Sequence, residues 1–548
     1  MTKILERYPV IILLLVCLVI FFCNLNELYV NIMEARNFVT AREMLTENNW
    51  LLTTLNGLPR YEKPPLPTWL TALSATVFGM KSLFALRLPA ALAATLMVWM
   101  MYRLNLKVHQ NKRSGLFAGL ILATSFYVIF SGRNGQWDIF THAFMLTSIY
   151  FLYTLFEEEK QMWKNALLAG IFAGASFLSK GPVSLYTLFL PFLIAYGVAY
   201  KYRNFTKKIL PAILFIAVMI VSGLWWFVYV RIADPETFVA IASEEATNWG
   251  SYNIRPFYYY WSFFTQSGIW TIPAFVGLLY PYLKNRVSDK KAYLFSLLWT
   301  ISSVVLLSVI PEKKSRYLLP VLLPLAMNTA FYIEYLVRTF ASLKNKKETF
   351  PVYFNFGLIA LIGVSFPVAG YIFFRKELQG LWLPFILASI FLFGIGVLMF
   401  RHLAKKNIQH VFLLTIAFIM SIILFGFPLE NTFSNDNTAF NNIDRLAAQA
   451  ARENINIYSF GEQAPEMIWE YKKIAPRLDA KSPVRVPEEN SFGVLVTLSE
   501  ETEFKRIFAT DFNIRLKETF DINYTAGKEE RNYRERLVSR YYILNKKP

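Results

Sequence analysis

The chain alternates long hydrophobic runs with short polar connections from residue 8 to residue 427, and then becomes polar and mixed. Runs of about 17 to 25 apolar residues are long enough for a helix to cross roughly 30 Å of hydrocarbon. The pattern therefore predicts an α-helical polytopic membrane protein with about thirteen transmembrane helices. These spans are predicted near residues 8–25, 83–105, 115–131, 138–156, 163–179, 183–200, 208–231, 263–283, 291–309, 317–337, 351–374, 380–400 and 409–427.

Basic residues fall on alternate connections between the runs, which predicts that these loops and the N-terminus are cytoplasmic. If the moderately apolar segment 64–80 were a full span, every later loop would change sides and the basic loops would lie on the external side. We therefore interpret this segment as a short interfacial or re-entrant helix. Residues 26–82, 132–137, 180–182, 232–262, 310–316, 375–379 and everything after about residue 428 are then external. The cations that set this orientation are Lys107, Lys112, Arg113, Lys201, Arg203, Lys207, Lys208, Lys284, Arg286, Lys290, Lys291, Arg338, Lys344, Lys346, Lys347, Arg401, Lys405 and Lys406.

Two segments outside the spans have patterns of their own. Residues 30–47 resemble an amphipathic helix, with Phe38 and Ala41 on the apolar face and Glu34 and Arg42 elsewhere, and we expect it on the outer membrane surface. After Phe427, β-rich pieces within 455–460 and 491–498 alternate with helical patterns within 441–454 and 499–508. The predicted domains are thus a transmembrane domain over residues 1–429, including the external loop 26–82, and a small soluble α/β domain over 430–548.

Composition agrees with a membrane protein, since 55% of the 548 residues are hydrophobic and only 17% are charged. The formal net charge of +18 could suggest nucleic-acid binding. The basic residues are dispersed in short loops, however, so the positive-inside bias explains them better and we expect no nucleic-acid partner. The only cysteines, Cys17 and Cys23, lie in the first apolar run and cannot build a disulfide framework.

Carboxylates occur in three separate external segments, at Glu34, Glu62 and Asp138. A carboxylate at the edge of an apolar cavity can act as a general base on an acceptor hydroxyl, and Glu34 and Asp138 are the candidates. Alternatively, these acids pair with neighbours such as Arg36 and Arg133 and only orient the helices.

External cations are the second candidate group, because basic residues outside the membrane run against the positive-inside tendency. A lipid phosphate or diphosphate is the natural anion at that depth. Ordinary contact with lipid headgroups is the alternative. The candidates are Lys63, Lys180, Lys313, Lys314 and Arg316.

The motifs EARNFVTAREML, NGLPRYEKPPLPTWL, WDIFTHAF, SKGP and KKSRYLLPVLLPLAM follow one another between residues 34 and 327. In that order the chain resembles the polyprenyl-phosphate-dependent glycosyltransferases of membrane superfamily C, namely bacterial aminoarabinose transferases and protein mannosyltransferases. The resemblance implies an external active site and a sugar donor linked to a lipid phosphate. It places catalytic carboxylates at Glu34 and Asp138 and donor-phosphate ligands at Lys63 and Arg316. Further candidate phosphate ligands are Lys180 and Lys313, and the candidate substrate-orienting residues are Arg36, Tyr61, Glu62 and Tyr317.

The chain departs from the family pattern in two places. The family has an Asp-Glu pair after the first span, whereas here Met33 precedes Glu34. Metal-binding relatives use the Glu of the EKP motif with a His from the large external loop, but residues 232–262 contain no His. A divalent metal is therefore left open, with Glu62 and Glu245 as the candidate ligands.

The sequence predicts a glycosyltransferase of the bacterial inner membrane that moves a sugar from undecaprenyl phosphate, or a similar polyprenyl phosphate, to an external acceptor. The acceptor is a lipid A-like molecule, a glycan or a protein. The alternative is a transporter or flippase for a polar lipid, a class that often shows paired halves. The sequence has no such symmetry, and its polar residues collect on one side rather than at the midplane.

Overall fold

The computed structural model describes residues 7–548 except 203–204, 376–377, 430–436, 481–482 and 525. Contacts divide the chain into two compact units, and each is described by itself. The membrane unit comprises residues 1–26, 61–70 and 81–429. The sheet unit comprises residues 27–60, 71–80 and 430–548.

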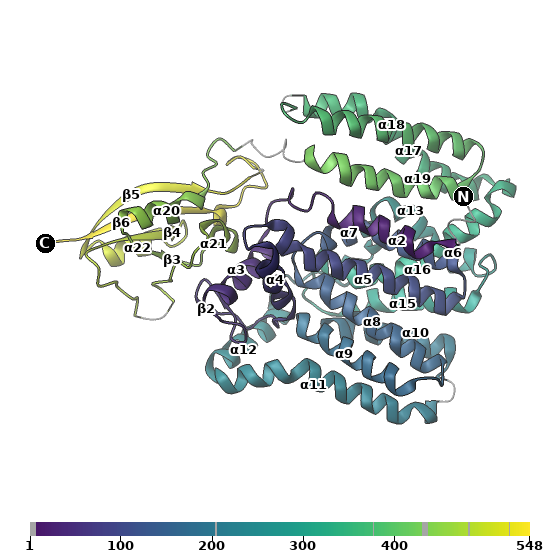
Figure 1. Cartoon of the computed structure of the whole chain (residues 1–548), viewed down its shortest axis with the longest axis horizontal. Coiled ribbons are helices and arrows are strands. Elements are labelled where there is room, and N and C mark those ends of the chain that lie inside the picture. The colour runs from purple at the N-terminus through teal and green to yellow at the C-terminus, as the bar shows by residue number, and fades with distance from the viewer. Residues whose placement is uncertain (1–6, 203–204, 376–377, 430–436, 481–482, 525) are drawn as a thin grey trace. The chain divides into compact units, whose positions relative to one another are not determined.

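The membrane unit is a bundle of helices in which α9 packs along α8 and α11, and α18 packs along α17 and α19 (Figure 1). Its helices are α2 (Pro9–Cys17), α5 (Leu83–His109), α6 (Lys112–Ala123), α7 (Phe126–Gly132), α8 (Trp137–Glu157), α9 (Met162–Lys180), α10 (Leu190–Tyr200), α11 (Ile209–Ala233), α12 (Pro235–Ser251), α13 (Thr271–Gly277), α14 (Tyr280–Leu283), α15 (Lys290–Val309), α16 (Leu319–Thr339), α17 (Lys346–Phe374), α18 (Trp382–Ala404) and α19 (Ile408–Ser421).

Within the described residues, eight helices are long and apolar enough to cross a membrane, and nine if a bent pair counts as one span. This confirms a polytopic helical membrane protein, although fewer helices are long and apolar enough to span a membrane than the thirteen expected. The bent pair is α6 with α7, which meet at 68° inside the predicted span 115–131. The predicted spans 8–25 and 183–200 are shorter apolar helices, and α9, at 163–179, is not among the eight.

The predicted span 263–283 is wrong as a continuous helix. It consists of a 3-10 segment, Phe263–Trp270, followed by the short helices α13 and α14. Gly268 has φ 67°, and a Cβ there would lie 2.8 Å from Cβ of Phe126. The break occurs where the backbone must approach α7 closely, which average hydropathy does not record.

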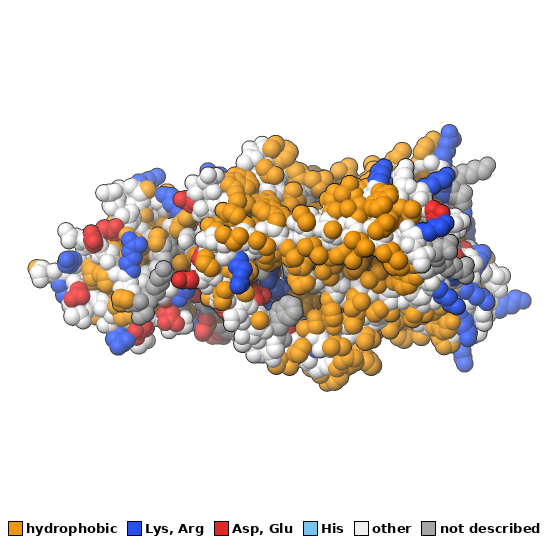
Figure 2. All heavy atoms as spheres, turned by 90° about the horizontal axis from the view of Figure 1, so that it is seen from below, with side chains coloured by type: hydrophobic (Ala, Val, Ile, Leu, Met, Phe, Trp, Pro, Cys, Tyr) orange, Lys and Arg blue, Asp and Glu red, His pale blue; other side chains and the backbone are white. Residues whose placement is uncertain are grey.

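The surface of the bundle is strongly apolar. Ile220, Val221 and Ile232 on α11 are 46%, 71% and 76% exposed. Figure 2 shows a broad orange band of hydrophobic side chains, with Lys and Arg side chains gathered beyond its right-hand end. A patch of this size is far larger than a soluble monomer exposes and is suited to contact with lipid.

The sheet unit contains a four-stranded sheet in the order β3-β4-β6-β5, in which β3 and β4 are parallel and the other pairs antiparallel. The strands and helices predicted after Phe427 are present. The elements are α3 (Ile32–Thr46), β1 (Thr54–Leu55), β2 (Leu58–Pro59), α4 (Leu66–Phe78, which begins in the membrane unit), α20 (Leu446–Glu453), β3 (Ile457–Phe460), α21 (Pro465–Tyr471), β4 (Ser491–Thr497), α22 (Glu501–Phe508), β5 (Phe512–Asp521) and β6 (Val538–Lys546).

Successive side chains along a strand point to opposite faces of the sheet, and both faces of this sheet are buried. Leu495 packs with Met467 of α21, whereas its neighbours Val494 and Val496 pack with Phe504 of α22. Helices therefore cover both faces of the sheet.

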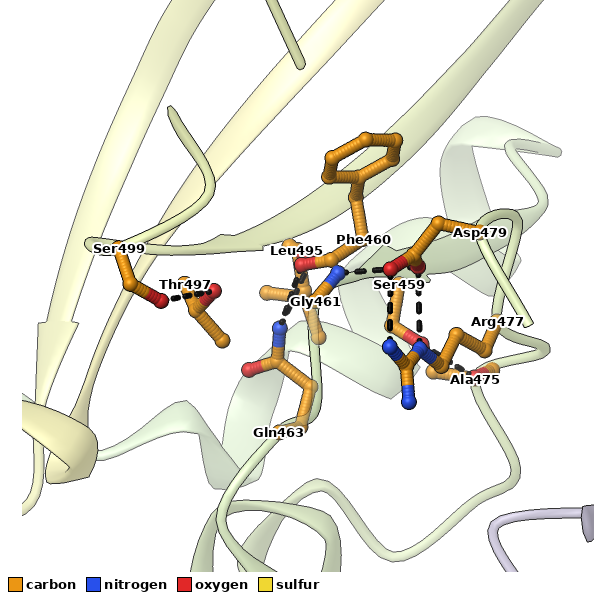
Figure 3. A network of polar contacts seen from close by, with 10 residues as sticks. All are labelled: Ser459, Phe460, Gly461, Gln463, Ala475, Arg477, Asp479, Leu495, Thr497 and Ser499. Atoms are coloured by element: carbon orange, nitrogen blue, oxygen red, sulfur yellow. Dashed lines mark hydrogen bonds and ion pairs between the residues drawn. The ribbon is translucent and has the colours of Figure 1, made fainter. Parts of the chain in front are cut away.

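A polar network closes the end of β3 (Figure 3). The Gly461 N–H donates to Asp479 Oδ1 at 3.0 Å, and Arg477 donates to the same carboxylate at 3.1 and 2.9 Å. Burial raises the pKa of Asp479, but these hydrogen bonds and the Arg477 charge outweigh it and hold the pKa below its usual range. The carboxylate is thus occupied by its own loop.

Residues 27–60 pack with the C-terminal part of the chain, whereas the predicted boundaries placed them with the spans. Arg42 on α3 donates to the carbonyl oxygen of Ile468 at 3.3 Å. The hairpin turn between β1 and β2 is Asn56-Gly57, and the Asn56 side chain bonds the backbone of Ala475 at 2.9 and 2.8 Å. These contacts connect the segment 27–60 to the end of α21 and the segment after it.

Helix α3 confirms the predicted helix but corrects its amphipathic pattern, because Glu34 and Glu43 are as buried as Phe38. The Glu43 carboxylate accepts hydrogen bonds from Thr54 Oγ1 at 2.6 Å and from the Asn56 N–H at 2.7 Å. Charged groups can be buried on this helix because the adjoining hairpin supplies donors.

Candidate functional site

Asp138 lies in the first turn of α8, after the short loop that follows α7, and is 1% exposed. A carboxylate is favoured there because backbone N–H groups point out of a helix N-terminus. Lys180, the last residue of α9, forms an ion pair with Asp138 Oδ1. Among the described residues, Asp138 Oδ2 has no hydrogen-bond partner. One carboxylate oxygen of Asp138 is therefore bound to Lys180, and the other is available to a ligand.

The position of Lys180 is set by the end of its helix and by an aromatic contact, as well as by its ion pair with Asp138. Gly181 follows the helix end with φ 71°. The Lys180 Nζ lies 5.1 Å from the centre of the Tyr317 ring, a distance suited to a cation–π contact. The Lys180 side chain is 7% exposed, and its ammonium group carries three N–H donors, one of which Asp138 Oδ1 accepts.

Arg316 lies in a 3-10 turn, Ser315–Leu318, directly before α16. It interacts electrostatically with both Asp138 and Lys180. Its Nε is buried without a hydrogen-bond partner in the described part of the chain, and no carboxylate there forms an ion pair with it. A guanidinium next to a buried acid–base pair, with donors to spare, is suited to a phosphate.

The segment before Arg316 anchors this turn. Glu312 accepts a hydrogen bond from the Tyr317 hydroxyl at 3.2 Å and pairs with Lys314 at 2.5 Å. Lys313 is 3% exposed and donates to the carbonyl oxygen of Ile310 at 2.5 Å, and burial lowers its pKa. Lys313 and Lys314 are thus occupied, whereas Arg316 contacts the Tyr317 ring and forms no ion pair within the described part of the chain.

Lys63 also belongs to the membrane unit and interacts electrostatically with Lys180. It forms an ion pair at 3.4 Å with Glu245 on α12, and the adjacent Glu62 is exposed. Tyr61 donates a hydrogen bond to Asp234 at 3.0 Å, and its pKa is raised by burial and by that bond. Tyr61 therefore fixes the loop that carries Lys63.

Glu34 has a structural task in the sheet unit. It is the third residue of α3, and its carboxylate lies 3.1 Å from the Asn31 side-chain amide and 3.5 Å from the Asn31 backbone N–H, which completes a capping box. Arg36 is half-buried on the same helix. Glu34 and Asp138 lie in different units, so the catalytic role of Glu34 stays a prediction.

The described residues contain no group of three or more His, Cys, Asp or Glu that could hold a metal ion. Of the two candidate ligands, Glu245 binds Lys63 instead, and Glu62 is exposed. His142, one helical turn after Asp138, is buried at 1% exposure. The donor set of the site therefore fits an anion better than a cation.

Sequence reasoning missed three features of this site. It left open which cation pairs with Asp138, and it considered Glu245 only as a metal ligand. It also passed over Asn134 and Gln136, which are 3% and 2% exposed beside Asp138. The signal was the polar run GRNGQ between two apolar segments, which is unusual for a loop that becomes buried.

The same fold is found among solved structures. The chain matches the crystal structure of ArnT from Cupriavidus metallidurans bound to undecaprenyl phosphate with a TM-score of 0.66 and 15% identity, over 98% of this chain and 97% of that one. The apo structure of the same protein matches with a TM-score of 0.65. At this identity the match shows a shared fold.

Sequence comparisons point to the same family. Residues 62–226 match the family model described as dolichyl-phosphate-mannose-protein mannosyltransferase. The undecaprenyl phosphate-alpha-4-amino-4-deoxy-L-arabinose arabinosyl transferase 1 of Proteus mirabilis is 26% identical over 66% of this chain and 66% of its own length. The corresponding transferase of Pseudomonas savastanoi is 27% identical over 54% and 55%. The predicted resemblance to aminoarabinose transferases is confirmed, and it spans between about half and about two thirds of these relatives' length.

Proposed function

We propose that the protein is a glycosyltransferase of the bacterial inner membrane that transfers a sugar from undecaprenyl phosphate, or a similar polyprenyl phosphate, to an acceptor at the external face. The observation that carries this proposal is the buried Asp138–Lys180 pair with Arg316 beside it. The similarity to aminoarabinose transferases supports the same reaction. It gives no support to the transporter alternative.

The proposed chemistry uses the donor phosphate as the leaving group. The bond between the anomeric carbon and the phosphate oxygen breaks, and its electron pair stays on undecaprenyl phosphate. Lys63 and Arg316 would stabilise the growing negative charge, which makes a separate general acid unnecessary. Lys180 would contribute through its remaining donors while it holds Asp138 in place.

The acceptor oxygen forms the new bond to the anomeric carbon. If the acceptor is a hydroxyl, its proton goes to Asp138 Oδ2, the oxygen that has no partner among the described residues. If the acceptor is a phosphate, as in a lipid A-like molecule, it is already ionised, and Asp138 orients Lys180 instead. Glycan and protein acceptors belong to the hydroxyl case.

Reconstitution tests the proposal. The purified protein in proteoliposomes is supplied with radiolabelled undecaprenyl-phosphate sugars and, separately, with lipid A, glycan or protein acceptors. We expect label to move to one acceptor class and undecaprenyl phosphate to be released in equal amount. Label that stays on the donor with every acceptor would contradict the proposal.

A further inference from the structure

The loop that enters α8 contains an unusual concentration of buried polar atoms. Asn134, Gln136, Asp138 and His142 are all at most 3% exposed. Asn134 Oδ1, Gln136 Nε2, Asp138 Oδ2 and His142 Nδ1 lack a hydrogen-bond partner within the described ranges. The Tyr127 side chain on α7 interacts with Gln136 and with Ser131.

Such atoms are costly unless something satisfies them. An unpaired buried donor or acceptor costs about 1–3 kcal/mol, and native proteins leave only a few per hundred residues. Four of them within nine residues, at the one buried ion pair of the proposed site, are more than packing requires. On the adjoining helices α8 and α9, by contrast, the buried hydroxyls of Ser148 and Ser176 each donate to a carbonyl oxygen of the facing helix.

The position of this loop identifies its ligand class. In the donor, the sugar ring is joined directly to the phosphate that Lys63 and Arg316 are proposed to bind. Polar groups adjoining Asp138 therefore lie within reach of the ring rather than of the polyprenyl tail. Asn134 Oδ1 and Asp138 Oδ2 accept hydrogen bonds and Gln136 Nε2 donates one, a combination that matches hydroxyl or amino substituents.

We propose that the loop 133–136, and in particular Asn134 and Gln136, forms the subsite that recognises the polar ring substituents of the donor sugar. This inference rests on the proposed function and adds the residues that select the sugar. Phosphate binding and sugar selection are thereby divided between separate elements, since Lys63 and Arg316 lie outside this loop.

The test compares one ligand with the sugar and one without it. Undecaprenyl phosphate is the sugar-free probe, and undecaprenyl phosphate carrying 4-amino-4-deoxyarabinose, mannose or glucose provides the sugars. We expect Asn134→Ala and Gln136→Ala to raise KM for the donor that wild type uses by about 3- to 10-fold, with a smaller change in kcat. The affinity for undecaprenyl phosphate should stay within about 2-fold of wild type.

Asn328→Ala is the matched control, because Asn328 is a fully buried asparagine of the same bundle whose Oδ1 also lacks a partner among the described residues. It should leave KM for the donor unchanged. An equal KM in wild type and both loop variants would overturn the subsite while leaving the proposed function intact. A rise in KM for the acceptor alone would also overturn it, because the loop would then bind the acceptor. Absence of transfer by wild type would instead contradict the proposed function.

Discussion

At the scale of single residues, the site depends on which charges are already paired. Lys313 and Lys314 bind their own turn, whereas Arg316, two residues further on, keeps free donors among the described residues. Asp138 divides its two oxygens between Lys180 and an unfilled position. A list of charged residues cannot show this difference, because it depends on contacts between distant parts of the chain.

Arg316→Gln is expected to weaken binding of undecaprenyl phosphate by about 10- to 100-fold, because hydrogen bonds to charged groups contribute about 1.5–3 kcal/mol. Microscale thermophoresis in detergent would measure this affinity. Arg338→Gln is the control, since Arg338 lies in the last turn of α16 and pairs with Glu334. Equal weakening in both variants would mean that Arg316 acts only through overall charge.

Glu34 gives a second prediction at this scale. Glu34→Gln preserves a capping box, and Glu34→Ala removes it, so we expect only the alanine variant to lower stability, by about 0.5–2 kcal/mol. Thermal unfolding measures the stability, and label transfer measures the activity. Loss of transfer in a fully stable Glu34→Gln variant would restore Glu34 to the catalytic machinery.

At the scale of elements, the sequence predicted most helices, together with the strands of the sheet unit, but not the breaks. The runs 115–131 and 263–283 are apolar on average, so their mean hydropathy resembles that of a continuous span even though 263–283 contains the polar stretch TQSG. The bend between α6 and α7 and the turn at Gly268 arise where chain segments approach each other closely. The partners of Asp138 and Lys63, at Lys180 and Glu245, are distant in sequence and were not predictable for the same reason.

Glu245 on α12 competes with the proposed donor phosphate for Lys63, because it pairs with the Lys63 ammonium. The pair is partly exposed, at 24% for Lys63 and 40% for Glu245, and such a pair contributes about 0.2–1 kcal/mol. Glu245→Gln removes the competing carboxylate, so undecaprenyl phosphate should bind up to about 5-fold more tightly. Glu244→Gln changes the neighbouring exposed carboxylate and should have no effect. Weaker binding in Glu245→Gln would show that Glu245 supports the site.

At the scale of the whole molecule, the basic loops predict a cytoplasmic N-terminus and an external C-terminal region. The chain suits cysteine labelling because Cys17 and Cys23 are its only cysteines. In a variant without them, a cysteine at Lys528 should react with a membrane-impermeant maleimide in intact spheroplasts, and one at Lys112 only after lysis. The reverse pattern would place the proposed site on the cytoplasmic side.

The central claim is that Asp138, held by Lys180 beside Arg316, is the centre of a sugar-transfer site. Its most direct test is label transfer from an undecaprenyl-phosphate sugar by Asp138→Asn and wild type in matched proteoliposomes. With a hydroxyl acceptor, we expect Asp138→Asn to lose at least about 100-fold in kcat, the lower end of the effect of a general base. Thermal unfolding and binding of undecaprenyl phosphate report whether the variant is still folded. A folded Asp138→Asn protein that transfers label at the wild-type rate would contradict the account.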